Sequence, residues 1–221
     1  AACDLHPLVS ELVVVLSPEL VASGETWVGA TRLPCRIVAG GARRQDSVRA
    51  GFGAVSPAAD LILVHDAARP FVTADVIDRV IAAAGTTGAC VPAIAVADTV
   101  KRAAVDGADR VVLTTIPREE LWLVQTPQGF RRDVLAQAVA DGESATEATD
   151  EARLVELAGG RVAIVDGDRR NVKMTTGDDV TEAKRVYATT RVGTGYDLHQ
   201  LVAGRPMVLA GVDLHALTGP L

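Results

Sequence analysis

Six short apolar runs occur along the chain, and they predict β-strands buried in a core. The first three are rich in Val, Ile and Leu and are bounded by turn residues, as is typical of buried strands. The six runs lie at residues 11–17, 36–40, 60–66, 90–96, 121–125 and 161–167. Residues 98–112 combine alternating and turn-like residues, which indicates a hairpin arm.

Segments with helical spacing separate these runs. In residues 74–84, apolar side chains recur at the spacing of one helix face. Further helices are predicted from Ser47, at 132–140, from Thr149 and at 178–187. Asp46 or Ser47 is the expected N-cap of the helix that begins there, and Thr149 is the expected N-cap of another.

Strands that alternate with helices are typical of βαβ units, so we expect an α/β fold with a mainly parallel sheet. Ligands of such sheets bind beyond the carboxyl ends of the strands. The residues directly after each predicted strand are therefore the candidates for a functional site.

Composition narrows the class of protein. The 221 residues carry 22 basic and 28 acidic side chains, a formal charge of −6, which argues against a nucleic-acid or polybasic membrane binder. Hydrophobic residues make up 48%, enough for a core, and aromatic residues only 3%, so that core must consist of Ala, Val, Leu and Ile.

Three scattered cysteines, without metal-type spacing, indicate a reducing compartment, and we expect a cytoplasmic protein. The first residue is not Met, and we expect an internal fragment of something longer.

The first candidate site follows the run at 60–66. Asp66 stands where that strand is expected to end, and such a carboxylate suits Mg²⁺, which prefers one or two carboxylates plus substrate phosphates. Arg69 adds a guanidinium fork that suits phosphate. The alternative is structural: Asp66 would cap the next turn and Arg69 would pair with an acid.

Two more candidates follow other strands. Gly40 and Gly41 allow a ligand to approach the backbone closely, and a helix from Ser47 would point N–H groups at an anion. The alternative there is a tight turn with an N-cap. Lys173 is one of only three lysines in the chain and lies after the last strand, although a solvated surface lysine fits equally well.

A fourth candidate lies near the end of the chain. Asp197 and His199 are two residues apart, so on a strand they would face the same side. A carboxylate and an imidazole can supply two of the three protein ligands of a Zn²⁺ site. A chance occurrence is the alternative.

Together these segments resemble a known family. The stretches HPLVSELVVVLSP, VAGGARRQDSVRAG, LVHDAARPFV, ADTVKR, LWLVQTPQGF, TDEARLVE and NVKMTT, between about residues 6 and 187, are similar to 2-C-methyl-D-erythritol 4-phosphate cytidylyltransferase of non-mevalonate isoprenoid biosynthesis. The resemblance implies a three-layer, Rossmann-like nucleotidyltransferase fold with a β-arm. Residues 191–221, with RVGTGYDLH and RPMVLAGVDL, resemble the opening of 2-C-methyl-D-erythritol 2,4-cyclodiphosphate synthase, to which the first family is fused in some bacteria. We therefore expect a cytidylyltransferase domain at 1–187 and a truncated second domain at 191–221.

The resemblance also implies a reaction and roles for residues. The 4-phosphate oxygen of methylerythritol phosphate attacks the α-phosphorus of CTP and releases pyrophosphate. Asp66 is expected to hold Mg²⁺, and Arg118 and Lys173 to clamp the methylerythritol phosphate with Arg69 and Thr99 beside them. The expected contacts to cytidine are Gly41, Ser47 and Ala67, and Thr126 is expected to line the substrate region. Because Thr99 and Arg118 belong to an arm that crosses to a neighbouring subunit in the family, a homodimer is implied.

Several departures from the family pattern bear on activity. The Gly-rich basic loop that wraps the CTP triphosphate in the family is absent, so we expect low activity. Ala42 stands where the family carries an acid, and Arg170 where some relatives carry Asp. In the second segment Asp197 and His199 would bind Zn²⁺, or another divalent metal, in a phosphorus–oxygen lyase site that releases CMP, and His215 is not expected to be the third ligand. Two alternatives stay open: another sugar-phosphate nucleotidyltransferase, or a catalytically inactive nucleotide-binding fragment.

Overall fold

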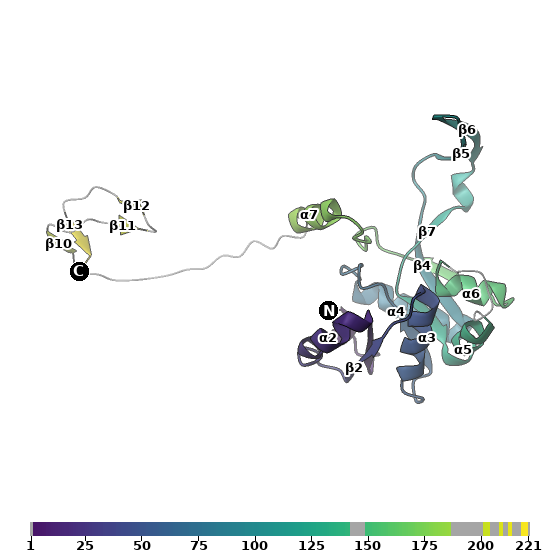
Figure 1. The fold of residues 1–221 in the computed structure, drawn as a ribbon, viewed down its shortest axis with the longest axis horizontal. Helices are drawn as coiled ribbons and strands as arrows, with labels where there is room; N and C mark the ends of the chain where they lie inside the picture. Colours follow the sequence, from purple (N-terminus) through teal and green to yellow (C-terminus); the bar gives the residue numbers. More distant parts are fainter. Residues whose placement is uncertain are drawn as a thin grey trace. The chain divides into compact units, whose positions relative to one another are not determined.

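The computed structural model describes residues 2–141, 149–186, 201–203, 208–209, 212–213 and 218–220. The chain divides into two compact units, Ala1–Asp179 and Val180–Leu221 (Figure 1). Among the described residues of the second unit, four short strands form two antiparallel pairs. These are β10 (Leu201–Ala203) with β13 (Thr218–Pro220) and β11 (Val208–Leu209) with β12 (Val212–Asp213). Asp197, His199 and His215 lie outside the described residues, so the expected Zn²⁺ ligands stay a prediction.

The first unit alternates strands and helices as the sequence predicts, and it also has helices at Ala2–Leu5 and Val21–Val28 that the sequence does not predict. Its strands are β1 (Leu12–Leu16), β2 (Cys35–Ala39), β3 (Leu61–Val64), β4 (Ala89–Ala95), β5 (Val100–Asp106), β6 (Asp109–Ile116), β7 (Trp122–Val124), β8 (Gln128–Arg131) and β9 (Ala163–Asp166). Its helices are α1 (Ala2–Leu5), η1 (Pro18–Leu20), α2 (Val21–Val28), α3 (Arg44–Ala54), α4 (Ala74–Thr87), η2 (Arg118–Glu120), α5 (Arg132–Asp141) and α6 (Glu151–Leu157). Helix α7 (Gly177–Val186) spans the boundary between the two units. No helix in the described ranges is long and apolar enough to cross a membrane.

The central sheet is mixed. Strands β3 and β4 both run antiparallel to β8, and β9 runs parallel to β4, so these three strands share one direction. Strand β7 pairs antiparallel with β4. Strands β1 and β2 form a separate parallel pair. The prediction of a mainly parallel sheet is thus corrected: β7 and β8 return against the other strands, because the chain comes back from the arm without a crossover helix.

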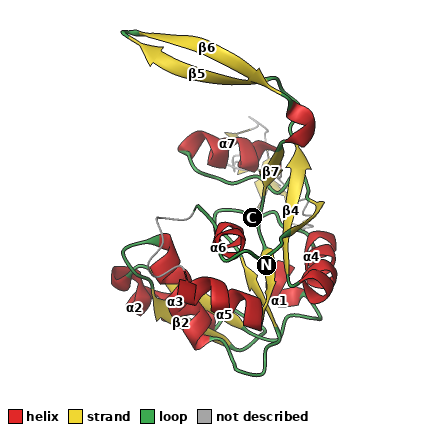
Figure 2. Cartoon of the chain, turned by 90° about the vertical axis from the view of Figure 1, so that its right-hand side faces the viewer, coloured by secondary structure: helices red, strands yellow, loops and turns green. Residues whose placement is uncertain are grey.

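The core of this unit has three layers. Ile62 packs in a cluster with Leu135 of α5 and Leu154 of α6, whereas its neighbour Leu63 packs against the buried apolar face of α4. Because successive residues of a strand point to opposite faces, α4 covers one face and α5 with α6 the other. Figure 2 shows these helices on either side of β4. The predicted three-layer α/β architecture is therefore confirmed in this unit.

The arm is a two-stranded hairpin of β5 and β6 that extends away from the central sheet (Figure 1). It turns at Gly107, whose φ of 59° is a left-handed conformation that glycine adopts without strain. The prediction of an arm over 98–112 is confirmed, although β6 continues to Ile116.

Two helix starts differ from the prediction. Helix α3 begins at Arg44, and its N-cap is Arg43, which forms a reciprocal capping box with Asp46. Ser47 is therefore inside the helix and does not cap it. Helix α6 is capped by Asp150, whose carboxylate accepts the Arg153 N–H at 2.9 Å, and not by Thr149.

Candidate active site

The site is built where β3 ends beside a break in the neighbouring strand. Asp66 lies two residues beyond β3, and β7 and β8 are interrupted by the segment 125–127, which contains the cis Thr126–Pro127 peptide. At this break the Thr126 side chain turns towards Asp66. The backbone N–H of Asp66 donates to Thr126 Oγ1 at 3.0 Å. Two predicted residues thus meet across 60 positions of sequence.

Three cationic side chains surround the Asp66 carboxylate, which is mostly buried. Lys173 Nζ lies 2.9 Å from Oδ2, Arg69 Nε lies 3.9 Å from Oδ2, and Arg44 Nη2 lies 3.8 Å from Oδ1. Burial acts to raise the pKa of Asp66, but the Lys173 hydrogen bond and the surrounding positive charges hold that pKa below its ordinary value. The carboxylate is therefore ionised at neutral pH, and the cluster keeps an excess of positive charge that suits phosphate.

The protonation state of His65 follows from its two partners. Its Nε2 lies 3.0 Å from the carbonyl oxygen of Arg69, which can only accept a hydrogen bond, so Nε2 carries the proton. Burial lowers the pKa of His65, so the ring is neutral and Nδ1 is an acceptor. Thr126 Oγ1, 3.0 Å from Nδ1, therefore donates to His65 while it accepts from Asp66. His65 thereby orients the hydroxyl that holds Asp66.

Arg44 connects this cluster to a buried acid that the sequence analysis missed. Arg44 Nη1 donates to Oε1 of Glu151, a side chain that is almost completely inaccessible to solvent. Burial raises the pKa of Glu151 although the Arg44 charge opposes it. Both residues lie inside the quoted stretches VAGGARRQDSVRAG and TDEARLVE, but nothing local pairs positions 107 residues apart.

The glycine-containing turn at 40–43 is anchored on α3. The Gly41 N–H donates to Ser47 Oγ at 3.1 Å, so Ser47 serves as a clamp for the turn. A Cβ on Gly41 would lie 2.4 Å from Cβ of Asp46, which requires glycine at this position. Arg44, in the first turn of the same helix, reaches Asp66, and the turn thus belongs to the same site. Ala67 is exposed directly beside Asp66.

Two predicted residues lie apart from this cluster. Thr99 and Arg118 are exposed at the base of the arm, and Arg118 donates to the carbonyl oxygen of Ala97. Among the described residues, no hydrogen bond or ion pair joins either of them to Asp66. Their predicted contribution across a subunit boundary stays a prediction.

The donor set around Asp66 fits a magnesium ion that is shared with a phosphate ligand. Mg²⁺ keeps several waters and is usually held by one or two carboxylates plus phosphate oxygens, and not by an all-protein cage. Asp66 offers one ionised, partly accessible carboxylate. Within the described residues no group of three or more His, Cys, Asp and Glu side chains could hold a metal by itself. Waters and phosphate oxygens would therefore supply the remaining ligands of such an ion.

The chain is similar to known proteins in both sequence and structure. The family model described as IspD: 2-C-methyl-D-erythritol 4-phosphate cytidylyltransferase matches residues 1–189. A relative named "Bifunctional enzyme IspD/IspF" from Anaeromyxobacter dehalogenans (strain 2CP-C) is 48% identical over 215 residues, which cover 96% of this chain and 54% of the relative. The chain thus spans about half the length of the curated relatives it matches.

Two solved structures have the same fold. The crystal structure of 2-C-methyl-D-erythritol 4-phosphate cytidylyltransferase from Thermus thermophilus is similar with a TM-score of 0.66 and 38% identity, covering 80% of this chain and 81% of that one. The bifunctional IspDF from Campylobacter jejuni is similar with a TM-score of 0.61 and 25% identity, covering 96% of this chain and 52% of that one. The α/β nucleotidyltransferase fold is thereby confirmed.

Removal of Arg44 is expected to destabilise the fold through Glu151. Arg44→Met leaves the buried Glu151 carboxylate without its partner, and breaking such a pair typically costs about 3–5 kcal/mol. Because Arg44 is 35% exposed, we expect the lower end of that range in urea unfolding. Arg44→Met combined with Glu151→Gln should recover much of the loss. An equal loss in the single and double variants would show that the pair is not the cause.

His65 is expected to make stability depend on pH. Its pKa is lower in the folded protein than in the unfolded chain, so the unfolded chain binds the proton more readily. The contribution of neutral His65 is complete above the ordinary histidine pKa of about 6.5 and is lost as pH falls through the lower folded-state value. Urea unfolding between pH 7.5 and pH 4.5 should show a steeper decline for the unsubstituted protein than for His65→Gln. Parallel declines would contradict the assignment.

Proposed function

The chain belongs to the 2-C-methyl-D-erythritol 4-phosphate cytidylyltransferase family, and from this premise we propose that the Asp66 site transfers a cytidylyl group from CTP to 2-C-methyl-D-erythritol 4-phosphate. The observation that carries the proposal is the cluster of three cations around one ionised carboxylate, at the end of β3. Such a cluster is suited to hold two phosphate-bearing substrates together. The fold and the family matches support the same reaction.

The reaction needs charge neutralisation and alignment more than covalent participation by the protein. An oxygen of the 4-phosphate forms a bond to the α-phosphorus of CTP while the bond from that phosphorus to the bridging oxygen breaks, and pyrophosphate leaves. Lys173, Arg69 and Arg44 would stabilise the negative charge that gathers on the phosphate oxygens. Lys173, whose side chain is 46% exposed, is the member of this set that can turn towards a ligand most readily.

A divalent cation would complete the site. Mg²⁺ bound to Asp66 would neutralise phosphate oxygens and align them for displacement. The hydrogen bond from the Asp66 backbone to Thr126 leaves both carboxylate oxygens available to the cation and to Lys173. In addition to its expected position in the substrate region, Thr126 would therefore hold Asp66 in place.

Recognition of cytidine is assigned to the glycine turn and to Ala67. Gly41 and Ser47 are joined by a hydrogen bond on either side of Arg44, and Ala67 is exposed and follows Asp66 in the chain, so all three are close in sequence to members of the cluster. The close contact between Gly41 and Asp46 allows no side chain that would fill the space above the turn. These features support the roles that the family resemblance implies for the three residues.

We further propose that the arm forms a homodimer in which Thr99 and Arg118 complete the site of the partner subunit. Large apolar side chains are exposed along the arm and on the adjoining strand β7, more than a solvated surface explains. They are Val105, Val111, Val112 and Leu113 on the arm, and Trp122, Leu123 and Val124 on β7. A second copy of the chain would cover them.

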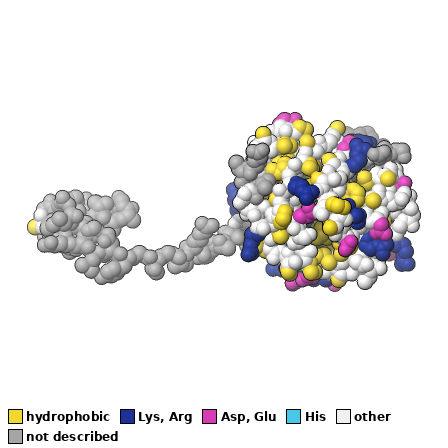
Figure 3. Space-filling model, turned by 90° about the horizontal axis from the view of Figure 1, so that it is seen from below, with side chains coloured by type: hydrophobic (Ala, Val, Ile, Leu, Met, Phe, Trp, Pro, Cys, Tyr) yellow, Lys and Arg dark blue, Asp and Glu magenta, His cyan; other side chains and the backbone are white. Residues whose placement is uncertain are grey.

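The free cysteines and the surface charge (Figure 3) fit an enzyme that acts on small molecules in the cytoplasm. Cys3, Cys35 and Cys90 are free thiols, which supports the proposed cytoplasmic location. Basic and acidic side chains are interspersed on the face shown in Figure 3, unlike the continuous basic stripe of a nucleic-acid binder. We propose neither a nucleic-acid nor a membrane partner.

A second activity is proposed for a longer protein that contains this chain. The relatives named as bifunctional extend well beyond the matched half, and residues 191–221 resemble the start of a cyclodiphosphate synthase. We propose that Asp197 and His199 would contribute to a Zn²⁺ site in that lyase domain. The metal would polarise a phosphate while the substrate cyclises with loss of CMP.

Asp66→Asn is expected to lower cytidylyl transfer on the order of 10²–10³-fold, the typical cost of one preorganised charged group. The measurement is pyrophosphate release from CTP and 2-C-methyl-D-erythritol 4-phosphate, relative to the unsubstituted chain. Asp133→Asn, at an exposed ion pair with Arg131, is the matched control and should leave the rate unchanged. CTP binding without turnover would indicate an inactive nucleotide-binding fragment, and transfer to a different sugar phosphate would indicate another nucleotidyltransferase.

Leu113→Asp is expected to shift the protein from dimer to monomer, because it places a charge in the proposed apolar interface. Leu157→Asp is the matched control, since Leu157 is similarly exposed, at 53% against 62%, but lies on α6. Sedimentation velocity over a concentration series separates the two species. Equal dimer stability in both variants would exclude the arm as the interface.

A further inference from the structure

Lys173 lies in a loop with no regular secondary structure, between β9 and α7. Its long side chain is 46% exposed, yet its Nζ lies 2.9 Å from Asp66. A lysine side chain gives up much rotameric freedom to hold one position, so this contact depends on where the loop places the Cα of Lys173. What anchors the loop therefore decides whether Lys173 faces Asp66.

One anchor of the loop is Asn171, two residues before Lys173. It is fully buried, and its Nδ2 donates to the carbonyl oxygen of Thr126 at 2.8 Å. Because that carbonyl can only accept, the orientation of the amide is determined. Thr126 also holds the Asp66 backbone through its hydroxyl. A single residue is thus the common anchor of both members of the ion pair.

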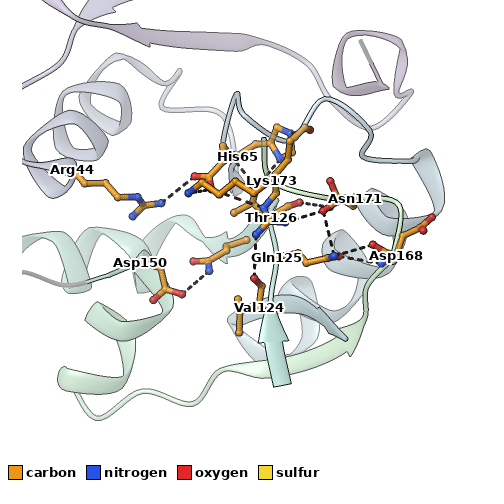
Figure 4. A network of polar contacts seen from close by, with 12 residues as sticks. Arg44, His65, Val124, Gln125, Thr126, Asp150, Asp168, Asn171 and Lys173 are labelled. Atoms are coloured by element: carbon orange, nitrogen blue, oxygen red, sulfur yellow. Dashed lines mark hydrogen bonds and ion pairs between the residues drawn. The ribbon is translucent and has the colours of Figure 1, made fainter. Parts of the chain in front are cut away.

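The backbone on either side of Asn171 is held as well. Its carbonyl oxygen accepts from Arg69 Nη1 at 2.8 Å and from Gln125 Nε2 at 3.3 Å, and the Met174 N–H donates to the Ala68 carbonyl at 2.8 Å. The Gln125 side-chain amide also binds the backbone at the start of the loop. Its Nε2 donates to the carbonyl oxygen of Asp168 at 2.8 Å, and its Oε1 accepts from the Asp168 N–H at 3.1 Å. The loop is therefore fastened at several backbone points, and within the described residues it is the Asn171 side chain that ties it to Thr126 (Figure 4).

We propose that Asn171 is a positioning residue of this site, whose buried amide sets Lys173 opposite Asp66 through the shared anchor Thr126. The proposal rests on the proposed function only for the catalytic use of Lys173. Asn171 Oδ1 is buried and has no hydrogen-bond partner in the described part of the chain. The bond from Nδ2 to the Thr126 carbonyl is therefore the one hydrogen bond of this side chain among the described residues.

The first test measures the placement of Lys173 without any substrate. Acetylation by N-hydroxysuccinimidyl acetate, followed by peptide mass mapping, gives the reactivity of Lys173 relative to Lys101, which lies on the arm and serves as the internal reference. Asp66→Asn, which removes the charge partner, should raise the relative acetylation of Lys173 several-fold. Asn171→Leu, which keeps the branched shape but removes the hydrogen bond, should raise it by a similar factor, whereas Gln137→Leu at an exposed amide on α5 should not.

The second test uses transfer to 2-C-methyl-D-erythritol 4-phosphate. Asn171→Leu should lower kcat/KM for this substrate about 10–100-fold, because a small misplacement of a positioned group can cost that much. In a Lys173→Met background the same substitution should cause no further loss. Asn171→Asp should recover activity as pH falls, because a buried carboxyl with a raised pKa becomes protonated and can donate to the Thr126 carbonyl. Asn171→Leu should show no such recovery.

Thermal unfolding establishes that each variant is folded. A folded Asn171→Leu protein with unchanged Lys173 acetylation would overturn the proposal, as would additive losses of Asn171→Leu and Lys173→Met. Unchanged acetylation in Asp66→Asn would also overturn it, since Lys173 would then not be held by that carboxylate. If the unsubstituted protein fails to transfer cytidylyl groups, the proposed function fails, and the acetylation series still decides the role of Asn171.

Discussion

The carboxylate of Asp66 is the charge on which the rest of the site depends. Lys173, Arg69 and Arg44 come from separate segments of the chain and would repel one another without it. Its hydrogen bonds and charges are strong enough to keep its pKa low despite burial. Removal of this one negative group would leave three positive side chains without their shared counter-charge, although Arg44 would still pair with Glu151 and Arg69 with the Asn171 carbonyl. Its substitution is therefore expected to affect more than metal binding.

The polar groups behind this cluster are arranged so that most find a partner. The hydroxyl of Thr126 accepts a hydrogen bond from the Asp66 backbone N–H and donates one to the neutral His65 ring. The donor and the acceptor of each bond are therefore determined. Arg44 pairs with both Glu151 and Asp66. It thereby links the start of α6 to the helix that follows the glycine turn. Buried polar networks of this kind are costly when incomplete, so they restrict the loops to one arrangement.

The sheet explains why these loops meet. Strand β3 ends where β7 and β8 are interrupted, and the break turns Thr126 out of the ladder and towards the strand end. Helix α4 packs on one face of this sheet, and α5 with α6 on the other. The arm has few such constraints: its side chains are exposed, and its proposed role requires a second subunit.

From the sequence alone one can predict the positions of most strands and helices, the hairpin arm, and the location of Asp66 and Lys173 in segments that follow strands, because hydrophobic periodicity and turn residues report local conformation. It missed β8, whose residues Gln128–Arg131 form no apolar run, and hence the mixed direction of the sheet. It also missed the Arg44–Glu151 pair and the anchor at Asn171, and it placed the start of α3 three residues late. Tertiary structure alone decided these features, because contacts between residues 45 or 107 positions apart depend on how strands pair in space and leave no periodic trace in the chain.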